Sequence, residues 1–255
     1  MPTLGSVAGV CLVSSVCLAS CGGDSSEPRR SADPGPPFGT DPFDCHAADE
    51  WEIFVLQDFE KGTATDFYTN ADGTEGSTIS PPVGSSSPAA ADIEGGRCGT
   101  SSRGFRMTGE GLRIWGMVFG WNFRDGTRDL TQWEGVSFWA RRGSTDSGRS
   151  LFFSVFDPKT DSSGGKCDSD SEILAEKCDA YGTGVGLDLE WRFFAIPFSA
   201  LRQRGFGVAT DELLVDEIIG FNWAADKGNW DVWIDDVALY RTPREESGGA
   251  GGMNP

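Results

Sequence analysis

Short runs of alternating apolar and polar residues recur along the middle of the chain. From residue 50 to residue 59 (EWEIFVLQDF), Trp51, Ile53, Val55, Gln57 and Phe59 share one face, and the residues between them share the other. Alternation with a period of two residues is the pattern of a β-strand. Six later runs have the same character and are predicted strands: residues 112–123, 135–140, 151–156, 191–196, 218–224 and 230–240.

The segments between these runs are rich in Gly, Asp, Asn, Ser and Pro, the residues that turns require. Only two short stretches, 198–204 and 210–215, have a helical pattern. Trp and Phe are abundant, with 9 and 17 copies, and such residues favour strands. Many short strands with polar connections predict an all-β fold, a β-sandwich of the jelly-roll type.

The two ends of the chain differ from this middle region. Residues 1–20 carry no charged side chain, and their apolar run at 7–16 is too short to span a bilayer, so they are predicted to be an export signal. Residues 21–44 and 245–255 are dense in Gly, Pro and Ser, with little to bury, and are predicted to be a disordered tether and a disordered tail. The folded domain is therefore expected at residues 45–244.

The signal ends in LASC at residues 18–21, which resembles the lipobox of bacterial lipoprotein signal peptides. The resemblance implies cleavage before Cys21 and acylation of its thiol, which would leave the lipid as the only membrane attachment. Lipoprotein signals normally carry Lys or Arg before the apolar run, and none is present here. An ordinary secretion signal is the alternative.

Four cysteines remain once Cys11 and Cys17 leave with the signal and Cys21 takes the lipid. An exported protein is expected to form two disulfides from them, and three pairings can be drawn. Pairing Cys167 with Cys178 would close the long polar excursion between them, and Cys45 with Cys98 would follow by elimination. A zinc site is the rival, but the chain has no C-x-x-C pair.

Charge and histidine content exclude several classes of function. With 39 Asp and Glu against 21 Lys and Arg, the formal net charge is -18, so no nucleic-acid partner is expected. The single histidine, His46, excludes a multi-histidine metal site and argues against a catalytic triad.

Four segments together resemble one family of sandwich domains. In this order along the chain, they are similar to segments of galactose-binding-like jelly rolls. The four are DFEKG at 58–62, DLTQWEGVSFWA at 129–140, IPF at 196–198 (following Trp191) and WDVWIDDVALY at 230–240. Family 11 carbohydrate-binding modules and related bacterial surface lipoproteins belong to this group. The resemblance implies polysaccharide as the partner, with β-glucan as one candidate.

A narrower subgroup of these lipoproteins carries D-x-x-T-x-x-x-G-G-x-C followed by C-x-D-H-F-G. Residues 157–167 match the first motif. The second motif is altered at residues 178–182 (CDAYG), which lack the histidine, so no role of that histidine carries over to this chain.

Exposed aromatic residues are the candidates for binding sugar, because the C–H face of a pyranose ring stacks on an aromatic ring. Strand alternation directs Trp139, Arg141, Trp233 and Asn222 away from the apolar face of their strands. Trp115 or Trp121, from the run 112–123, would complete the predicted carbohydrate-binding face. The alternative for each tryptophan is a place in the core.

Asp235 and Asp236 interrupt an otherwise apolar strand, which indicates a bulge or a bound cation. The resemblance implies a structural calcium ion between the opening acidic segment and this pair, with Asp58, Glu60, Asp235 and Asp236 as ligands. Hydrogen bonding of these carboxylates to turn amides is the alternative.

The sequence thus predicts a non-catalytic, polysaccharide-binding lipoprotein at the bacterial outer membrane or cell surface. A protein-binding surface lipoprotein and a glycoside-active jelly-roll enzyme are the alternatives. The enzyme has less support because the E-x-D-x-x-E run of jelly-roll laminarinases is absent.

Overall fold

The computed structural model describes residues 44–73 and 75–243. This part of the chain folds into twelve β-strands in two antiparallel sheets, with four short 3-10 helices in the connections. The predicted export signal, Cys21, almost all of the tether and the tail lie outside the described residues. Within the described residues, none of the helices is long and apolar enough to cross a membrane.

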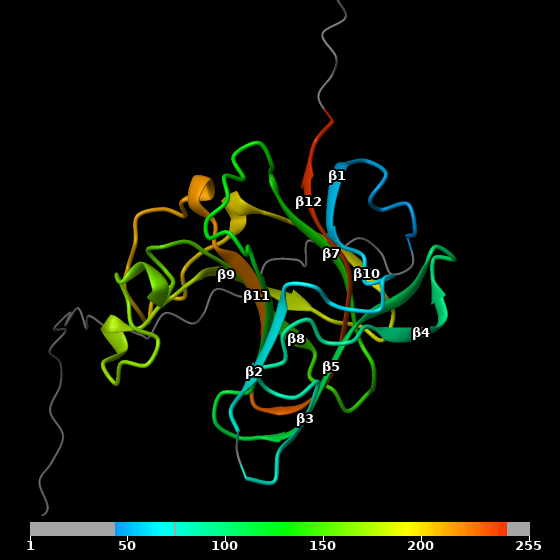
Figure 1. Cartoon of the computed structure of the whole chain (residues 1–255), viewed down its shortest axis with the longest axis horizontal. Helices are drawn as coiled ribbons and strands as arrows, with labels where there is room; N and C mark the ends of the chain where they lie inside the picture. Colours follow the sequence, from blue (N-terminus) through cyan, green and yellow to red (C-terminus); the bar gives the residue numbers. More distant parts are fainter. Residues whose placement is uncertain (1–43, 74, 244–255) are drawn as a thin grey trace, which may run out of the picture. The chain divides into compact units, whose positions relative to one another are not determined.

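The larger sheet has seven strands and is organised around β12, its longest strand. Its order is β10-β7-β12-β5-β3; β1 pairs with the end of β12, and β4 with the start of β5 (Figure 1). The strands are β1 (Glu52–Gln57), β3 (Thr78–Ser80), β4 (Ala91–Arg97), β5 (Ser101–Leu112), β7 (Gly135–Arg142), β10 (Arg192–Pro197) and β12 (Gly228–Arg241).

The smaller sheet has five strands in the order β2-β6-β11-β8-β9. Its strands are β2 (Phe67–Ala71), β6 (Met117–Asn122), β8 (Ser150–Phe156), β9 (Tyr181–Gly186) and β11 (Gly220–Ala225). Each strand pairs with its neighbours without a register shift. Residues that are paired across the sheet therefore lie on the same face of it, either towards the core or away from it.

The core is aromatic and lies between the two sheets. Trp223 of β11 is fully buried, and rings of both sheets pack against it, including Phe119 of β6 and Phe138 of β7. Alternate residues of each strand supply this layer, which is the pattern that the sequence shows. The predicted all-β sandwich is therefore confirmed.

One predicted strand is divided in two. The run 112–123 contains the end of β5 and all of β6, joined by a tight turn. Gly116 in this turn has a φ of 106°, and a Cβ at this position would lie 2.0 Å from the carbonyl oxygen of Ala225. Only glycine fits here, and it ends the alternation that had suggested one long strand.

The helical stretches are shorter than predicted. Within 198–204 the structure has a 3-10 turn at Phe198–Ala200, and the second one lies at Val215–Glu217, at the end of the stretch 210–215.

Two disulfides join the four cysteines of the domain. They are Cys45–Cys98 and Cys167–Cys178, the pairing that closes the polar excursion between β8 and β9. Two disulfides in a domain of this size are typical of exported proteins.

Candidate functional site

The outer face of the five-stranded sheet carries a row of polar residues at its centre. Strand pairing places Tyr68, Gly120, Asn222, Ser154 and Gly182 side by side across all five strands. Their neighbours along each strand point into the core, so these five residues face away from it. The Ser154 hydroxyl donates a hydrogen bond to Asn222 Oδ1 at 3.0 Å.

The glycines in this row make room for aromatic rings that lie across the sheet. A Cβ on Gly120 would come within 2.7 Å of the Tyr68 ring and hydroxyl, and one on Gly182 within 2.4 Å of the Phe152 ring. The Tyr68 and Phe152 rings therefore lie directly against the backbone of Gly120 and Gly182. A side chain at either glycine would collide with the ring above it. The result is a flat polar and aromatic floor.

Tyr68 keeps its hydroxyl proton at any physiological pH. Burial raises the pKa of Tyr68 to about 12; a hydrogen bond with Asn222 acts in the opposite direction, and the negative charge of Asp161 adds to the rise. The hydroxyl can therefore serve as a neutral hydrogen-bonding group beside the Asn222 amide.

A guanidinium group covers one end of the floor. Arg204 Cζ lies 4.4 Å from the centroid of the Phe152 ring and 4.9 Å from that of Phe206, so the two rings hold it by cation–π contacts. Among the described residues Arg204 has no salt-bridge partner within 4 Å. Its donors are thus available to a ligand.

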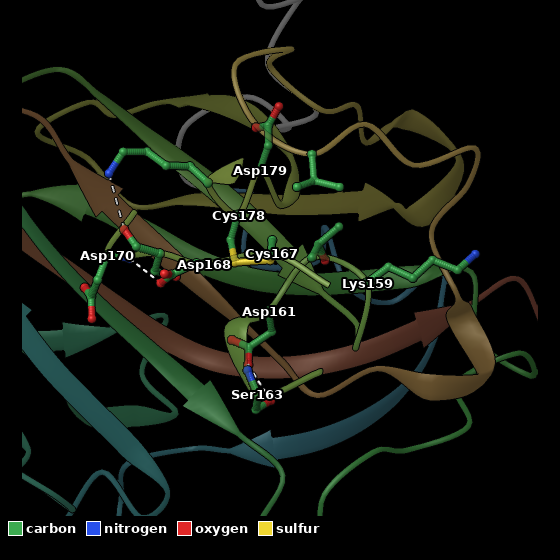
Figure 2. Close-up of a disulfide and its surroundings, with 12 residues drawn as sticks. Lys159, Asp161, Ser163, Cys167, Asp168, Asp170, Cys178 and Asp179 are labelled. Carbon is green, nitrogen blue, oxygen red and sulfur yellow. Dashed lines mark hydrogen bonds between the residues drawn. A yellow bond between two sulfur atoms is a disulfide. The ribbon is translucent and has the colours of Figure 1, made fainter. Parts of the chain in front are cut away.

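A buried carboxylate fixes the loop that carries Arg204 and Phe206. Asp179 Oδ1 accepts a hydrogen bond from the Arg204 amide, and Oδ2 accepts from the amides of Gly205 and Phe206, at 3.2, 2.6 and 3.2 Å. Asp179 directly follows Cys178 of the second disulfide (Figure 2). The disulfide and this carboxylate together attach the loop to the excursion between β8 and β9.

The first turn of the same excursion is ordered by the residues that match the first lipoprotein motif. Asp157 is buried and accepts hydrogen bonds from the amides of Lys159, Thr160 and Leu214 and from the Thr160 hydroxyl. Asp161 follows and binds the amide and hydroxyl of Ser163, on the opposite side of the disulfide from Asp179 (Figure 2). These contacts give the matched residues a structural role beside the floor.

Floor and loops together enclose a groove of about 300 Å³. Its rim includes Trp115, whose side chain is 44% exposed at the turn between β5 and β6. The groove thus combines aromatic rings, amide and hydroxyl groups, one guanidinium and one carboxylate, that of Asp161. The lining residues are Tyr68, Trp115, Val118, Asn122, Phe152, Ser154, Phe156, Thr160, Asp161, Ser169, Cys178, Ala180, Arg204, Phe206, Asn222 and Ala224.

The residues predicted to bind carbohydrate lie in three different places. Asn222 and Trp115 line the groove, whereas Trp121 belongs to the core between the sheets. Trp139, Trp233 and Arg141 lie on the outer face of the other, seven-stranded sheet. Sequence alternation assigned the outward direction correctly for Asn222, Trp139, Trp233 and Arg141 and not for Trp121, and it could not show that the residues belong to different sheets. Tyr68, Ser154 and Arg204 are groove residues that the sequence prediction missed.

Trp139 and Trp233 face outward and are nevertheless covered. Trp139 is 3% and Trp233 6% exposed, because arginine side chains lie over their rings and both belong to a second apolar cluster on this face, with Phe193 and Trp191. Arg106 and Arg141 both lie 5.0 Å from the Trp233 centroid, and Arg106 is also paired with Asp231. These two tryptophans therefore present no open ring face for stacking.

The four acids predicted to bind calcium lie near one another at the start of β5, but protein groups already contact them. Glu60 accepts hydrogen bonds from Ser101, Ser102 and Arg103, and Arg97 pairs with Asp235 and Asp236. Burial and the charge of Asp236 raise the pKa of Asp235 to about 6, although Arg97 and Ser101 act to lower it. Calcium binding at these acids remains a prediction.

A larger cavity, of about 690 Å³, lies beside the ends of β7 and β10. The Trp133 ring in its wall is in cation–π contact with Arg241, whose Cζ lies 5.0 Å from the ring centroid, and packs against Phe54. The hydroxyl of Tyr181, also in the wall, is engaged by Thr210. We therefore favour the smaller groove, where polar groups and rings face the open space.

Comparison with solved structures finds carbohydrate-binding modules among the similar domains. The family 11 carbohydrate-binding module CtCBM11, solved in solution, superposes with a TM-score of 0.51 at 16% identity, over 75% of this chain and 96% of the module. The family 11 module of Clostridium thermocellum in complex with a β-1,3-1,4-mixed-linked tetrasaccharide has a TM-score of 0.48 at 17% identity, covering 73% and 94% of the two chains. A family 30 module of a Clostridium thermocellum cellulosomal cellulase has a TM-score of 0.43 at 12% identity, covering 69% and 91%.

No model of a protein family matches the chain, and no curated protein sequence matches it. The structural likeness to the family 11 module in solution concerns the fold, and it confirms the sandwich resemblance noted from the sequence.

Proposed function

We propose that this protein binds a neutral polysaccharide along the groove on the five-stranded sheet and does not cleave it. The observation that carries the proposal is the row of Tyr68, Asn222 and Ser154 across the sheet, where glycines leave room for aromatic rings. Flat rings beside fixed amide and hydroxyl groups match the two kinds of surface on a sugar, its C–H face and its hydroxyls.

Each group of the groove has a function in this proposal. Tyr68 and Trp115 offer rings to successive sugar units, while Asn222 and Asn122 offer amides to their hydroxyls. Arg204, in cation–π contact with Phe152, presents paired N–H donors that fit two adjacent hydroxyls. Binding to rigid groups loses less conformational entropy than binding to mobile ones, which favours affinity.

A neutral ligand is favoured over an acidic one. The formal charge of -18 repels a polyanion, and Asp161 places a carboxylate inside the groove. Arg204 alone does not offset these charges. Mixed-linkage β-glucan, the type of ligand bound by the family 11 module of Clostridium thermocellum, is the first polysaccharide to test.

The groove lining supports binding without hydrolysis. Glycoside hydrolysis generally uses two carboxyl groups on either side of the scissile bond. Of the described residues that line the groove, only Asp161 carries a carboxyl group. Its Oδ1 is also engaged by Ser163. A binding module that holds the polymer in place is therefore the simpler function.

Export of the protein and anchoring of Cys21 by lipid complete the proposal. The two disulfides support an oxidising location, and a lipid at Cys21 would hold the domain at the bacterial surface, where polysaccharide is available. If Cys21 is acylated, radiolabelled fatty acid will be incorporated into the wild-type protein and not into Cys21→Ser.

Native gel electrophoresis in polysaccharide-containing gels tests the binding claim. We expect retardation of the purified protein by at least one neutral glucan, weaker retardation by an acidic polysaccharide, and no new reducing ends after long incubation. Equal mobility in every neutral polysaccharide would contradict the binding claim. Release of reducing ends would contradict the non-catalytic role.

A further inference from the structure

The guanidinium group of Arg97 contacts two of the four predicted metal ligands, Asp235 and Asp236. Arg97 is 4% exposed, and its Nε donates to Asp235 Oδ2 at 2.8 Å. Its Nη2 donates to Asp236 Oδ2, and its Cζ lies 4.7 Å from the centroid of the Trp139 ring. A buried cation thus contacts both acids of the pair and stacks on the outward tryptophan of β7.

Neighbouring polar groups engage the remaining acids. Glu60 Oε1 accepts from the amides of Ser102 and Arg103, at 2.8 and 2.9 Å, and Oε2 accepts from the Ser102 hydroxyl at 2.7 Å. The Ser101 hydroxyl is 2.9 Å from Glu60 and 2.7 Å from Asp235, and so links the two carboxylates. Asp58 accepts from the Glu60 amide at 3.2 Å. The acids are therefore part of one hydrogen-bonded cluster.

This arrangement does not fit a calcium ion. Calcium requires roughly six to eight oxygen ligands at about 2.3–2.6 Å, converging on one point. Over residues 44–73 and 75–243, no group of three or more His, Cys, Asp and Glu residues is arranged to hold a metal ion. A calcium ion placed between Asp235 and Asp236 would also lie next to the Arg97 guanidinium, and like charges in a poorly solvated site repel strongly.

We propose that Arg97 supplies the positive charge at this cluster in place of a metal ion, so that the sandwich folds and stays folded without calcium. A disulfide and an aromatic ring next to Arg97 fix the position of its side chain. Arg97 ends β4, the next residue is Cys98, and the disulfide to Cys45 attaches this point to the first described residues of the chain. The Trp139 ring supports the guanidinium from the sheet side.

The wild-type protein provides the first arm of the test. We expect the same melting temperature in excess EDTA and in millimolar calcium chloride, and no stoichiometric calcium or other divalent metal by elemental analysis of the purified protein. A lower melting temperature in EDTA, or one bound calcium ion per chain, would overturn the proposal. This arm needs no mutant, so it tests the proposal even if the variants below fail to fold.

Variants of the cluster provide the second arm. Arg97→Met keeps most of the volume of the side chain and leaves the buried Asp235 and the partly exposed Asp236 without their cation, so we expect the melting temperature to fall by roughly 10 °C. Asp235→Asn removes one of the charges that Arg97 offsets, and the same Arg97→Met change in the Asp235→Asn background should cost much less. Equal losses in the two backgrounds would show that Arg97 acts through packing alone, and would overturn the charge-replacing role.

Discussion

At the residue scale, Trp233 shows how a side chain can point away from the core and still be buried. Arg106 and Arg141 cover its ring, and Trp191 packs against it at 6.4 Å. We therefore expect Trp233→Ala to reduce the free energy of unfolding by about 3–5 kcal/mol, the usual cost of truncating a buried tryptophan. Denaturant unfolding measures this. A loss below about 1 kcal/mol would show that the ring is as open as its strand direction suggests.

Glu60 is expected to make stability depend on pH in the acid range. Burial raises the pKa of Glu60, but hydrogen bonds from Ser102, Arg103 and Ser101 outweigh it and lower the pKa to about 2, from an ordinary value of 4.5. The stability that Glu60 contributes is therefore complete above pH 4.5 and is lost as the pH falls towards 2.

Thermal melts at several pH values test this dependence. Between pH 4.5 and 2, the melting temperature of the wild type should fall more steeply than that of Glu60→Gln, which has no carboxylate to protonate. Parallel curves for the two proteins would contradict the role of Glu60.

Sequence alternation identified part of the site at this scale. It placed Asn222 outward, and the exposed position of Trp115 follows from the turn at Gly116. It could not find Tyr68 or Arg204, because Tyr68 lies in a five-residue strand of mixed polarity and Arg204 lies in a loop. Tyr68 lies in the groove because its ring packs over Gly120 of another strand, and Arg204 because it contacts Phe152. The local sequence pattern around either residue contains no information about such contacts.

At the element scale, the loop of residues 203–208 is the part of the groove that a buried carboxylate, that of Asp179, holds by several hydrogen bonds. Asp179 binds three successive amides of this loop, and the Gln203 side chain donates to the carbonyl oxygens of Asp179 and Val208. We expect Asp179→Ala to release the loop and to weaken polysaccharide binding severalfold, because Arg204 and Phe206 would no longer be held in place.

Gel-retardation affinities for Asp179→Ala, together with its melting temperature, measure this effect. Arg204→Ala, made in the Asp179→Ala background, should add little further loss, because both changes remove the same contribution. Fully additive losses would show that Asp179 stabilises the fold without positioning Arg204.

The sequence predicted the strands of this molecule unevenly, for a physical reason. The strands β7, β8, β10, β11 and β12 line the aromatic core and carry strong apolar alternation, so their ranges were close to correct. The strands β4 and β5 are polar and contain several glycines, and β3 has only three residues; they were missed apart from the end of β5, as were the edge strands β2 and β9. Glycines and polar residues interrupt the alternation in these strands, although β5 contributes Phe105 and Met107 to the core.

At the scale of the described sandwich, the two sheets have different outer faces. On the seven-stranded sheet, arginines cover the tryptophans and Arg97 pairs with Asp235 and Asp236, so the face is filled by its own side chains. On the five-stranded sheet, glycines and small residues leave a groove. Ligand binding is therefore expected on the second face, and the proposed function depends on this difference.

The most direct test is the affinity of two matched pairs of variants for the retarding polysaccharide. Trp115→Ala and Arg204→Ala remove groups that line the groove, and each should weaken binding roughly threefold or more. Ile114→Ala removes the exposed apolar neighbour of Trp115, and Arg149→Ala removes an exposed arginine outside the groove, so both should bind like the wild type. Unchanged affinity of Trp115→Ala and Arg204→Ala, with melting temperatures equal to that of the wild type, would contradict the assignment of the binding site to this groove.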